Sequence, residues 1–254
     1  MKFLPIALEY YWMVVVIIAS IPLLTGTVVY WIAMRPSVIA GFRPGDLAAS
    51  YLGAIALPFA LFLAFMISDI WARETRYAQT VLQEVQRIDA IHDISRICGR
   101  GCDPVDDALG AYARALSTYE WDEGWIEENA EVMKVFDRLI NAVATAEQTG
   151  AVPPHLRSAL VTGQTELRRL RTDRHFILHA DLAPHRWIVV LTLGLLTQIA
   201  MAALHIGRRP QLLLSLSTFS LAFAVVLAYT VALAWPTVDE SIIPSNELAR
   251  LLAQ

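Results

Sequence analysis

The chain has 254 residues, of which 56% are hydrophobic and only 17% are charged. A soluble globular domain usually carries about 25% charged residues, and the apolar residues here are clustered, which favours a membrane protein. The formal net charge of −4 is mild and no basic surface dominates the sequence, so nucleic acid is not expected as a partner.

Four apolar runs predict transmembrane helices, and they cover residues 10–34, 47–71, 187–206 and 212–235. Each run is close to or longer than the roughly 20 residues that a helix needs to cross the bilayer core. Tyrosine and tryptophan residues stand at the ends of these runs, as membrane interfaces favour. The first run lacks a basic leader and a small-residue cleavage site, so we expect a retained span rather than a signal peptide.

The second run has two distinct sides. A small-residue ladder predicts close helix packing and consists of Ala56, Ala60 and Ala64. The opposite side holds Tyr51, Ile55, Pro58, Phe62, Phe65 and Asp69. One interpretation is a pore wall, with Phe62 and Phe65 as an apolar constriction and Asp69 at its mouth. The alternative is that this side meets lipid or packs on another span, while Asp69 pairs with Arg73.

A helical insert is predicted between the second and third spans, over residues 98–184. The second helix continues to about Ile97, because the segment keeps a 3.6-residue apolar period and lacks glycine and proline. Asp103-Pro104 predicts the next helix start, with Asp103 as N-cap. A third helix is expected from about Glu123 to Thr149, ending at Gly150, and a fourth from Pro153-Pro154 to about Leu182. The fold class is therefore an all-α membrane protein with a soluble helical insert.

Two cysteines, Cys98 and Cys102, are separated by three residues. This is not the spacing of common zinc or thioredoxin motifs, and a metal pair would need two more ligands besides His92. Two alternatives stay open: reduced thiols in a loop, or a local disulfide if the insert faces an oxidising compartment. No metal site is predicted.

Charged residues of the insert gather in two stretches. A basic stretch approaches the third span and comprises Arg168, Arg169, Arg171, Arg174, His175, His179, His185 and Arg186. It would attract anions or anionic lipid headgroups, or form a solvated helix side with internal salt bridges. An acidic stretch around Glu120 and Glu123–Glu131 is interpreted as a solvated surface, since it matches no calcium loop.

The last two spans carry few polar groups. Gln198 is interpreted as an interhelical hydrogen-bond donor or a polar wall element. The fourth span repeats a small-residue ladder that predicts helix packing: Ser220, Ala224, Ala228 and Ala232. Four spans place both termini, a 236–254 tail and the insert on one side, with the short loops 35–46 and 207–211 on the other. Arginines near the span ends occur on both sides, so they leave the orientation open.

This arrangement resembles the bacterial bestrophin-like domain proteins over most of the chain. The matching motifs are Phe59–Trp71, Arg73–Ala78, Glu84, Tyr112, Tyr119–Trp121, Leu167–Arg174, Trp235-Pro236 and Ile242–Leu251. The resemblance implies a distant likeness to bestrophins, which are homo-oligomeric anion channels with a pore lined by the second helix; Phe62 and Phe65 would then lie at the pore. It also favours a bacterial inner membrane with the insert and both termini in the cytoplasm. No counterpart of the bestrophin calcium cluster occurs here, and Asp69 would disfavour anions.

We therefore expect a homo-oligomeric channel for inorganic ions in a lipid bilayer, without a cofactor. The alternative is a non-conducting scaffold or regulatory subunit that acts through the insert. An enzyme is not expected, because the sequence shows no nucleophile–base pair, metal set or phosphate-binding loop.

Overall fold

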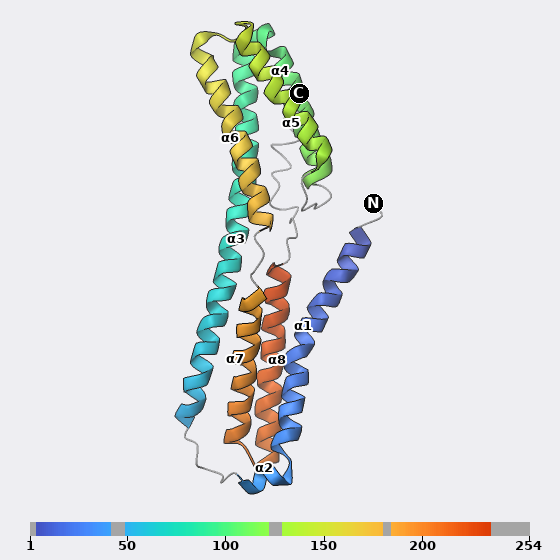
Figure 1. Ribbon diagram of the computed structural model, residues 1–254, viewed down its shortest axis with the longest axis vertical. Coiled ribbons are helices and arrows are strands. Elements are labelled where there is room, and N and C mark those ends of the chain that lie inside the picture. The colour runs from blue at the N-terminus through green and yellow to red at the C-terminus, as the bar shows by residue number, and fades with distance from the viewer. Residues whose placement is uncertain (1–3, 42–48, 122–128, 180–183, 235–254) are drawn as a thin grey trace. The chain divides into compact units, whose positions relative to one another are not determined.

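The computed structural model describes residues 4–41, 49–121, 129–179 and 184–234, and every regular element among them is helical (Figure 1). The elements in chain order are α1 (Leu4–Ala33), α2 (Pro36–Gly41), α3 (Ala49–Cys98), η1 (Gly99–Cys102), α4 (Asp103–Leu116), η2 (Ser117–Trp121), α5 (Ala130–Gln148), α6 (Pro154–His179), α7 (Pro184–Leu204) and α8 (Arg209–Ala234). The expected tail 236–254 and its Trp235-Pro236 motif lie outside the described residues.

The chain divides into two compact units. The first, called the membrane unit below, comprises Met1–Ala72 and Leu182–Trp235; the second unit contains Arg73–Asp181. Within the described ranges, four helices are long and apolar enough to cross a membrane, namely α1, α3, α7 and α8. The chain is therefore a membrane protein by helix length and composition, as the four apolar runs predict.

Helices α1, α7 and α8 run side by side in the membrane unit (Figure 1). Two glycines allow close approach. A Cβ built on Gly26 of α1 would lie 2.2 Å from Ser220 Oγ, and one on Gly194 of α7 would lie 2.2 Å from the Phe223 ring. Small residues let apolar helices approach until their backbones nearly touch, which replaces the hydrophobic driving force that is missing in lipid.

The second unit is built on one apolar core from α3, α4, α5 and α6. The periodic residues of α3 are all buried: Val81, Val85, Ile88 and Ile91. The same holds for Val105, Leu109, Tyr112 and Leu116 of α4, and for Val132, Phe136, Leu139 and Val143 of α5. Each stripe recurs at three- and four-residue intervals because that spacing keeps the side chains on one face of a helix.

The helix ends in the second unit follow local chemistry. Gly150 ends α5 with a φ of +67°, the left-handed conformation expected of it. Asn129 caps the start of α5 by accepting a bond from the Glu131 N–H. The N-cap of α4 is Cys102 rather than Asp103, so Asp103 lies inside the first turn. Its negative charge suits that place, because the helix dipole is positive there.

Candidate functional sites

The membrane half of α3 packs against α7 and α8 through one narrow stripe. This stripe and its partners form an apolar cluster of Phe59, Met66, Ile70, Val190, Phe223 and Leu227. The Phe59 ring stands edge-on to the Phe223 ring, with 5.0 Å between centroids. At about 100° per residue, the stripe falls between the predicted pore side and the alanine ladder.

Both flanks of that stripe stay uncovered within one protomer. On the predicted pore side, Tyr51, Pro58, Phe65 and Asp69 are exposed, and Ile55 and Phe62 are half-buried. Phe65 is 71% exposed, whereas Phe62 packs partly against the apolar cluster. On the ladder side, Ala60 and Ala64 are exposed and Ala56 is half-buried. A single protomer thus leaves two surfaces of α3 for lipid, water or another copy of the chain.

Two prolines interrupt the membrane helices in different surroundings. Each lacks an N–H, so it cannot bond to the carbonyl four residues back. Pro22 of α1 is buried in the helix bundle, where Gln198 donates to its carbonyl at 2.8 Å. Pro58 of α3 is exposed, and so is Ala54, whose carbonyl Pro58 leaves without its helical donor. The predicted pore side therefore carries a backbone acceptor at the protomer surface.

Asp69 forms an ion pair across two helices. Arg186, at the start of α7, donates to its carboxylate, and both side chains are partly exposed. The sequence alternative paired Asp69 with Arg73 of the same helix, but this ion pair joins α3 to α7. An exposed pair contributes little stability, about 0–1 kcal/mol. The pair also changes the local electrostatic field, because the positive charge of Arg186 offsets the negative charge of Asp69.

Gln198 of α7 forms a polar contact that joins three membrane helices. Its amide donates to the Pro22 carbonyl of α1 and, at 3.0 Å, to Ser220 Oγ of α8. Gln198 and Ser220 are buried, and so is Ala224, while Ala228 is half-buried. The interpretation of Gln198 as an interhelical donor is confirmed. Ser220 faces the same junction, directly opposite Gly26.

A buried ionic cluster lies in the second unit. Arg174 is 1% exposed; its Nε lies 2.9 Å from Glu84 Oε2, and its Nη2 donates to Glu120 Oε2. Arg171 Nη2 donates to the other oxygen of Glu120 at 2.9 Å. The hydroxyl of Tyr112 donates to Glu84 Oε1, also at 2.9 Å. Two carboxylates and two guanidinium groups thus balance one another where each alone would be costly to bury.

Burial shifts the titration of this cluster. It raises the pKa of Glu84, against the opposing influence of Arg174. It also raises the pKa of Tyr112 well above its ordinary value, and Glu84 adds to that rise. Burial alone would lower the pKa of Arg174, but Glu84 and Glu120 reverse the direction and raise it. The phenol and the guanidinium therefore stay protonated at neutral pH and serve as fixed donors.

This cluster is not predicted from the sequence. The prediction that Glu120 lies on a solvated surface is wrong, because Glu120 is 1% exposed. Of the alternatives for Arg171 and Arg174, the internal salt bridges are present, but both side chains are buried against Glu120 rather than solvated. One signal was present: Glu84 falls three residues after Val81 and four before Ile88, inside a buried stripe. A carboxylate at such a position requires a buried cationic partner.

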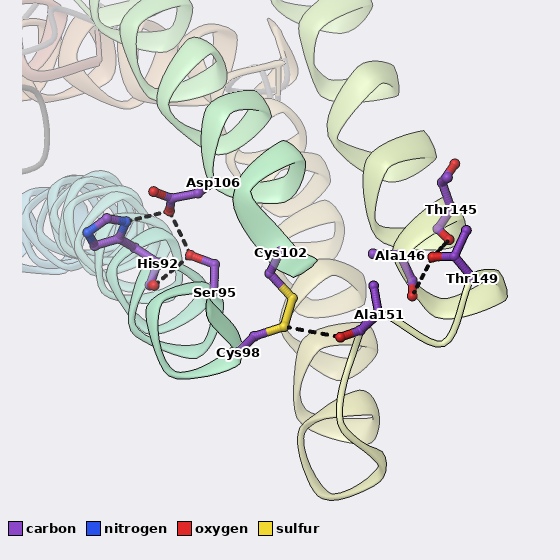
Figure 2. Close-up of a disulfide and its surroundings, with 9 residues drawn as sticks. All are labelled: His92, Ser95, Cys98, Cys102, Asp106, Thr145, Ala146, Thr149 and Ala151. Atoms are coloured by element: carbon purple, nitrogen blue, oxygen red, sulfur yellow. Dashed lines mark hydrogen bonds and ion pairs between the residues drawn. A yellow bond between two sulfur atoms is a disulfide. The ribbon is translucent and has the colours of Figure 1, made fainter. Parts of the chain in front are cut away.

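Figure 2 shows a disulfide between Cys98 and Cys102 at the junction of α3, η1 and α4. Next to it, Asp106 of α4 accepts from Ser95 Oγ and lies 2.6 Å from His92 Nδ1. Of the two alternatives for the cysteines, the structure contains the disulfide. Among the described residues, no group of three or more His, Cys, Asp or Glu side chains is placed to hold a metal ion.

These features define an all-helical membrane protein with an uncovered second membrane helix. The model of the Bestrophin-like domain family matches residues 21–239, and the chain therefore belongs to the bestrophin-like family. A crystal structure described only as that of a membrane protein has a TM-score of 0.65 and 12% sequence identity, over 94% of this chain and 99% of that one. At this identity the likeness shows a shared fold only. No curated protein matches.

Proposed function

We propose that the protein is a homo-oligomeric ion channel whose pore is lined by the side of α3 that carries Pro58, Phe62, Phe65 and Asp69. The observation that carries the proposal is the uncovered flank of α3. Four spans in one protomer rarely enclose a pore, so symmetry has to build one around a shared axis. Membership of the bestrophin-like family supports the same assembly.

The exposed proline supports a water-filled environment for this flank. In hydrocarbon, a backbone carbonyl without a donor costs several kcal/mol, so irregular backbone is tolerated where it meets protein or water. The Ala54 carbonyl lies beside Pro58 on an exposed surface with little side-chain bulk, because Gly53 is its neighbour. A pore supplies water to this carbonyl, whereas lipid supplies no donor.

The alanine ladder supports contact between copies. Ala60 and Ala64 stay exposed in one protomer, although small residues at four-residue spacing favour close helix packing. If the ladder of one copy packs on its neighbour, the pore side turns towards the axis, because the two lie on opposite flanks of the α7–α8 contact stripe. The half-buried Phe62 and the exposed Phe65 then form the apolar constriction.

The test is ion flux into liposomes that contain the purified protein. Phe65→Ala should raise the flux severalfold over the wild type, because it removes a ring from the narrowest part of the pore. Leu221→Ala is the matched control, since Leu221 of α8 is 59% exposed but lies outside the proposed pore. Its flux should equal that of the wild type. Flux no greater than that of protein-free liposomes for all three proteins would refute conduction.

The Asp69–Arg186 pair gives a second, directional test. Both charges would stand near one end of the pore, so neither anions nor cations meet a ring of a single sign. Asp69→Asn should shift the reversal potential towards anions, and Arg186→Gln should shift it towards cations by a comparable amount. Equal reversal potentials for both variants and the wild type would place this pair away from the ion pathway.

A further inference from the structure

The disulfide packs against the core of the second unit rather than standing on an open surface. Cys102 is fully buried in the core of the second unit, and Cys98 is half-buried against it. Cys98 Sγ lies 3.8 Å from the Ala151 carbonyl, in the turn between α5 and α6 (Figure 2). A Cβ built on Gly101 would lie 2.9 Å from the same carbonyl. The α5–α6 turn thus packs against the junction, and the buried Cys102 sulfur is closed to an exchanging thiol, while part of Cys98 meets solvent.

The backbone is shaped to fit the bond. Gly99, inside the disulfide ring, has a φ of +77°, a conformation that side-chain-bearing residues rarely adopt. The Cα atoms of the two cysteines are 5.8 Å apart, inside the usual range of about 4.4–6.8 Å for disulfides. An exposed, labile bond is typical of redox catalysts, whereas an enclosed bond is typical of a structural disulfide.

Structural disulfides persist in oxidising compartments and are rare in the reducing cytoplasm. We infer that the second unit lies on the extracytoplasmic side of the membrane, where Cys98 and Cys102 are oxidised during folding. The two thiols lose two protons and two electrons as the sulfur–sulfur bond forms. The electrons and protons reduce the disulfide of an exchanging protein oxidant to a dithiol. This orientation is the reverse of the cytoplasmic insert that the family resemblance favours.

The first experiment counts thiols in the unaltered protein. Whole cells are quenched in acid, and the denatured chain is treated with N-ethylmaleimide before and after reduction. With only two cysteines in the chain, the expected result is no added label before reduction and two labels after it. Two labels before reduction would show that the thiols are reduced in the cell and would overturn the inference.

The second experiment reads the orientation directly. Gln148→Cys places a thiol at the exposed end of α5 in the second unit, and Gln211→Cys places one at the exposed start of α8 beside a short loop. A membrane-impermeant maleimide applied to intact spheroplasts should label Gln148→Cys at once. Gln211→Cys, the matched control, should react only after the membrane is permeabilised. The reverse pattern would place the second unit in the cytoplasm. Neither result depends on whether the protein conducts ions.

Discussion

The two units hide their apolar side chains to different degrees, and the contrast shows what a sequence can reveal about each. In the second unit, every residue of the periodic stripes on α3, α4 and α5 is buried. In the membrane unit, large apolar side chains such as Phe65, Trp31 and Leu214 are about 70% exposed within one protomer. Water enforces a sharp division between inside and outside, whereas lipid accepts apolar residues on every face of a helix.

The units also differ in how they use polar contacts. The membrane unit joins α1, α7 and α8 through one amide, that of Gln198, and through glycines that admit neighbouring side chains. The second unit buries two complete ion pairs in its core. The second unit therefore needs charge balance in addition to its apolar core, whereas the membrane unit depends on close fit between helices.

Removing one charge from the ionic cluster should have the largest effect. Arg174→Gln leaves Glu84 without its guanidinium partner in a site that excludes water. The loss is about 3–5 kcal/mol, as for other broken buried ion pairs. The change in the unfolding free energy of the second unit is measured in detergent by hydrogen exchange of its core helices. The control is Arg169→Gln on the same helix, which is exposed and should stay within about 0.5 kcal/mol of the wild type.

The next effect tests close fit in the membrane unit. Gly194→Ala places a methyl group against the Phe223 ring and should cost about 1–3 kcal/mol through overpacking. Gly110→Ala in α4 meets only the flexible end of Arg114 at 3.8 Å, so it should be neutral or mildly stabilising. Thermal unfolding midpoints in detergent compare the two. If Gly110→Ala lowered the unfolding midpoint more than Gly194→Ala, close fit would not be the feature that distinguishes the membrane unit.

A smaller effect is expected from the polar junction of the membrane helices. Gln198→Leu keeps most of the side-chain volume but removes both donated hydrogen bonds. Interhelical hydrogen bonds in membranes contribute about 0.6–2 kcal/mol, so the loss should fall in that range. The double variant with Ser220→Ala should add little to the single one, because both alter the same contact. Fully additive losses would show that the two residues act separately.

The smallest effect on stability is expected at the exposed ion pair. Asp69→Asn, Arg186→Gln and the double variant should each change the unfolding free energy by at most about 1 kcal/mol. A double-mutant cycle of thermal midpoints measures their coupling. A coupling as large as that within the Glu84–Arg174 pair would mean that Asp69 and Arg186 are shielded from water, contrary to their partial exposure.

The fold follows from the sequence where water dictates the pattern. The run from Leu47 to Ile97 predicts one helix, and α3 spans Ala49–Cys98, because no glycine or proline occurs between Ala72 and Ile97. Gly150 predicts the end of α5 for a conformational reason that is local to the chain. The length of α3 and the end of α5 can both be predicted because each depends only on residues that are close together in the sequence.

The site residues follow less well, because their roles depend on partners distant in the sequence. Glu120 lies among acids that favour solvent, and only the approach of Arg171 and Arg174 makes its burial tolerable. Asp69 has Arg73 within reach on its own helix, yet its ion pair with Arg186 joins residues 117 positions apart. Helical periodicity cannot reveal such pairs, since it describes one helix at a time.

The short ring of the disulfide has a consequence for the order of events during folding. Its two sulfurs come from residues four positions apart, so the bond needs no helix beyond this junction to form. A chain with only two cysteines also offers no wrong pairing within itself. Oxidation can therefore precede the docking of α5 and α6, and the finished bond then holds the corner between α3 and α4 while the later helices arrive.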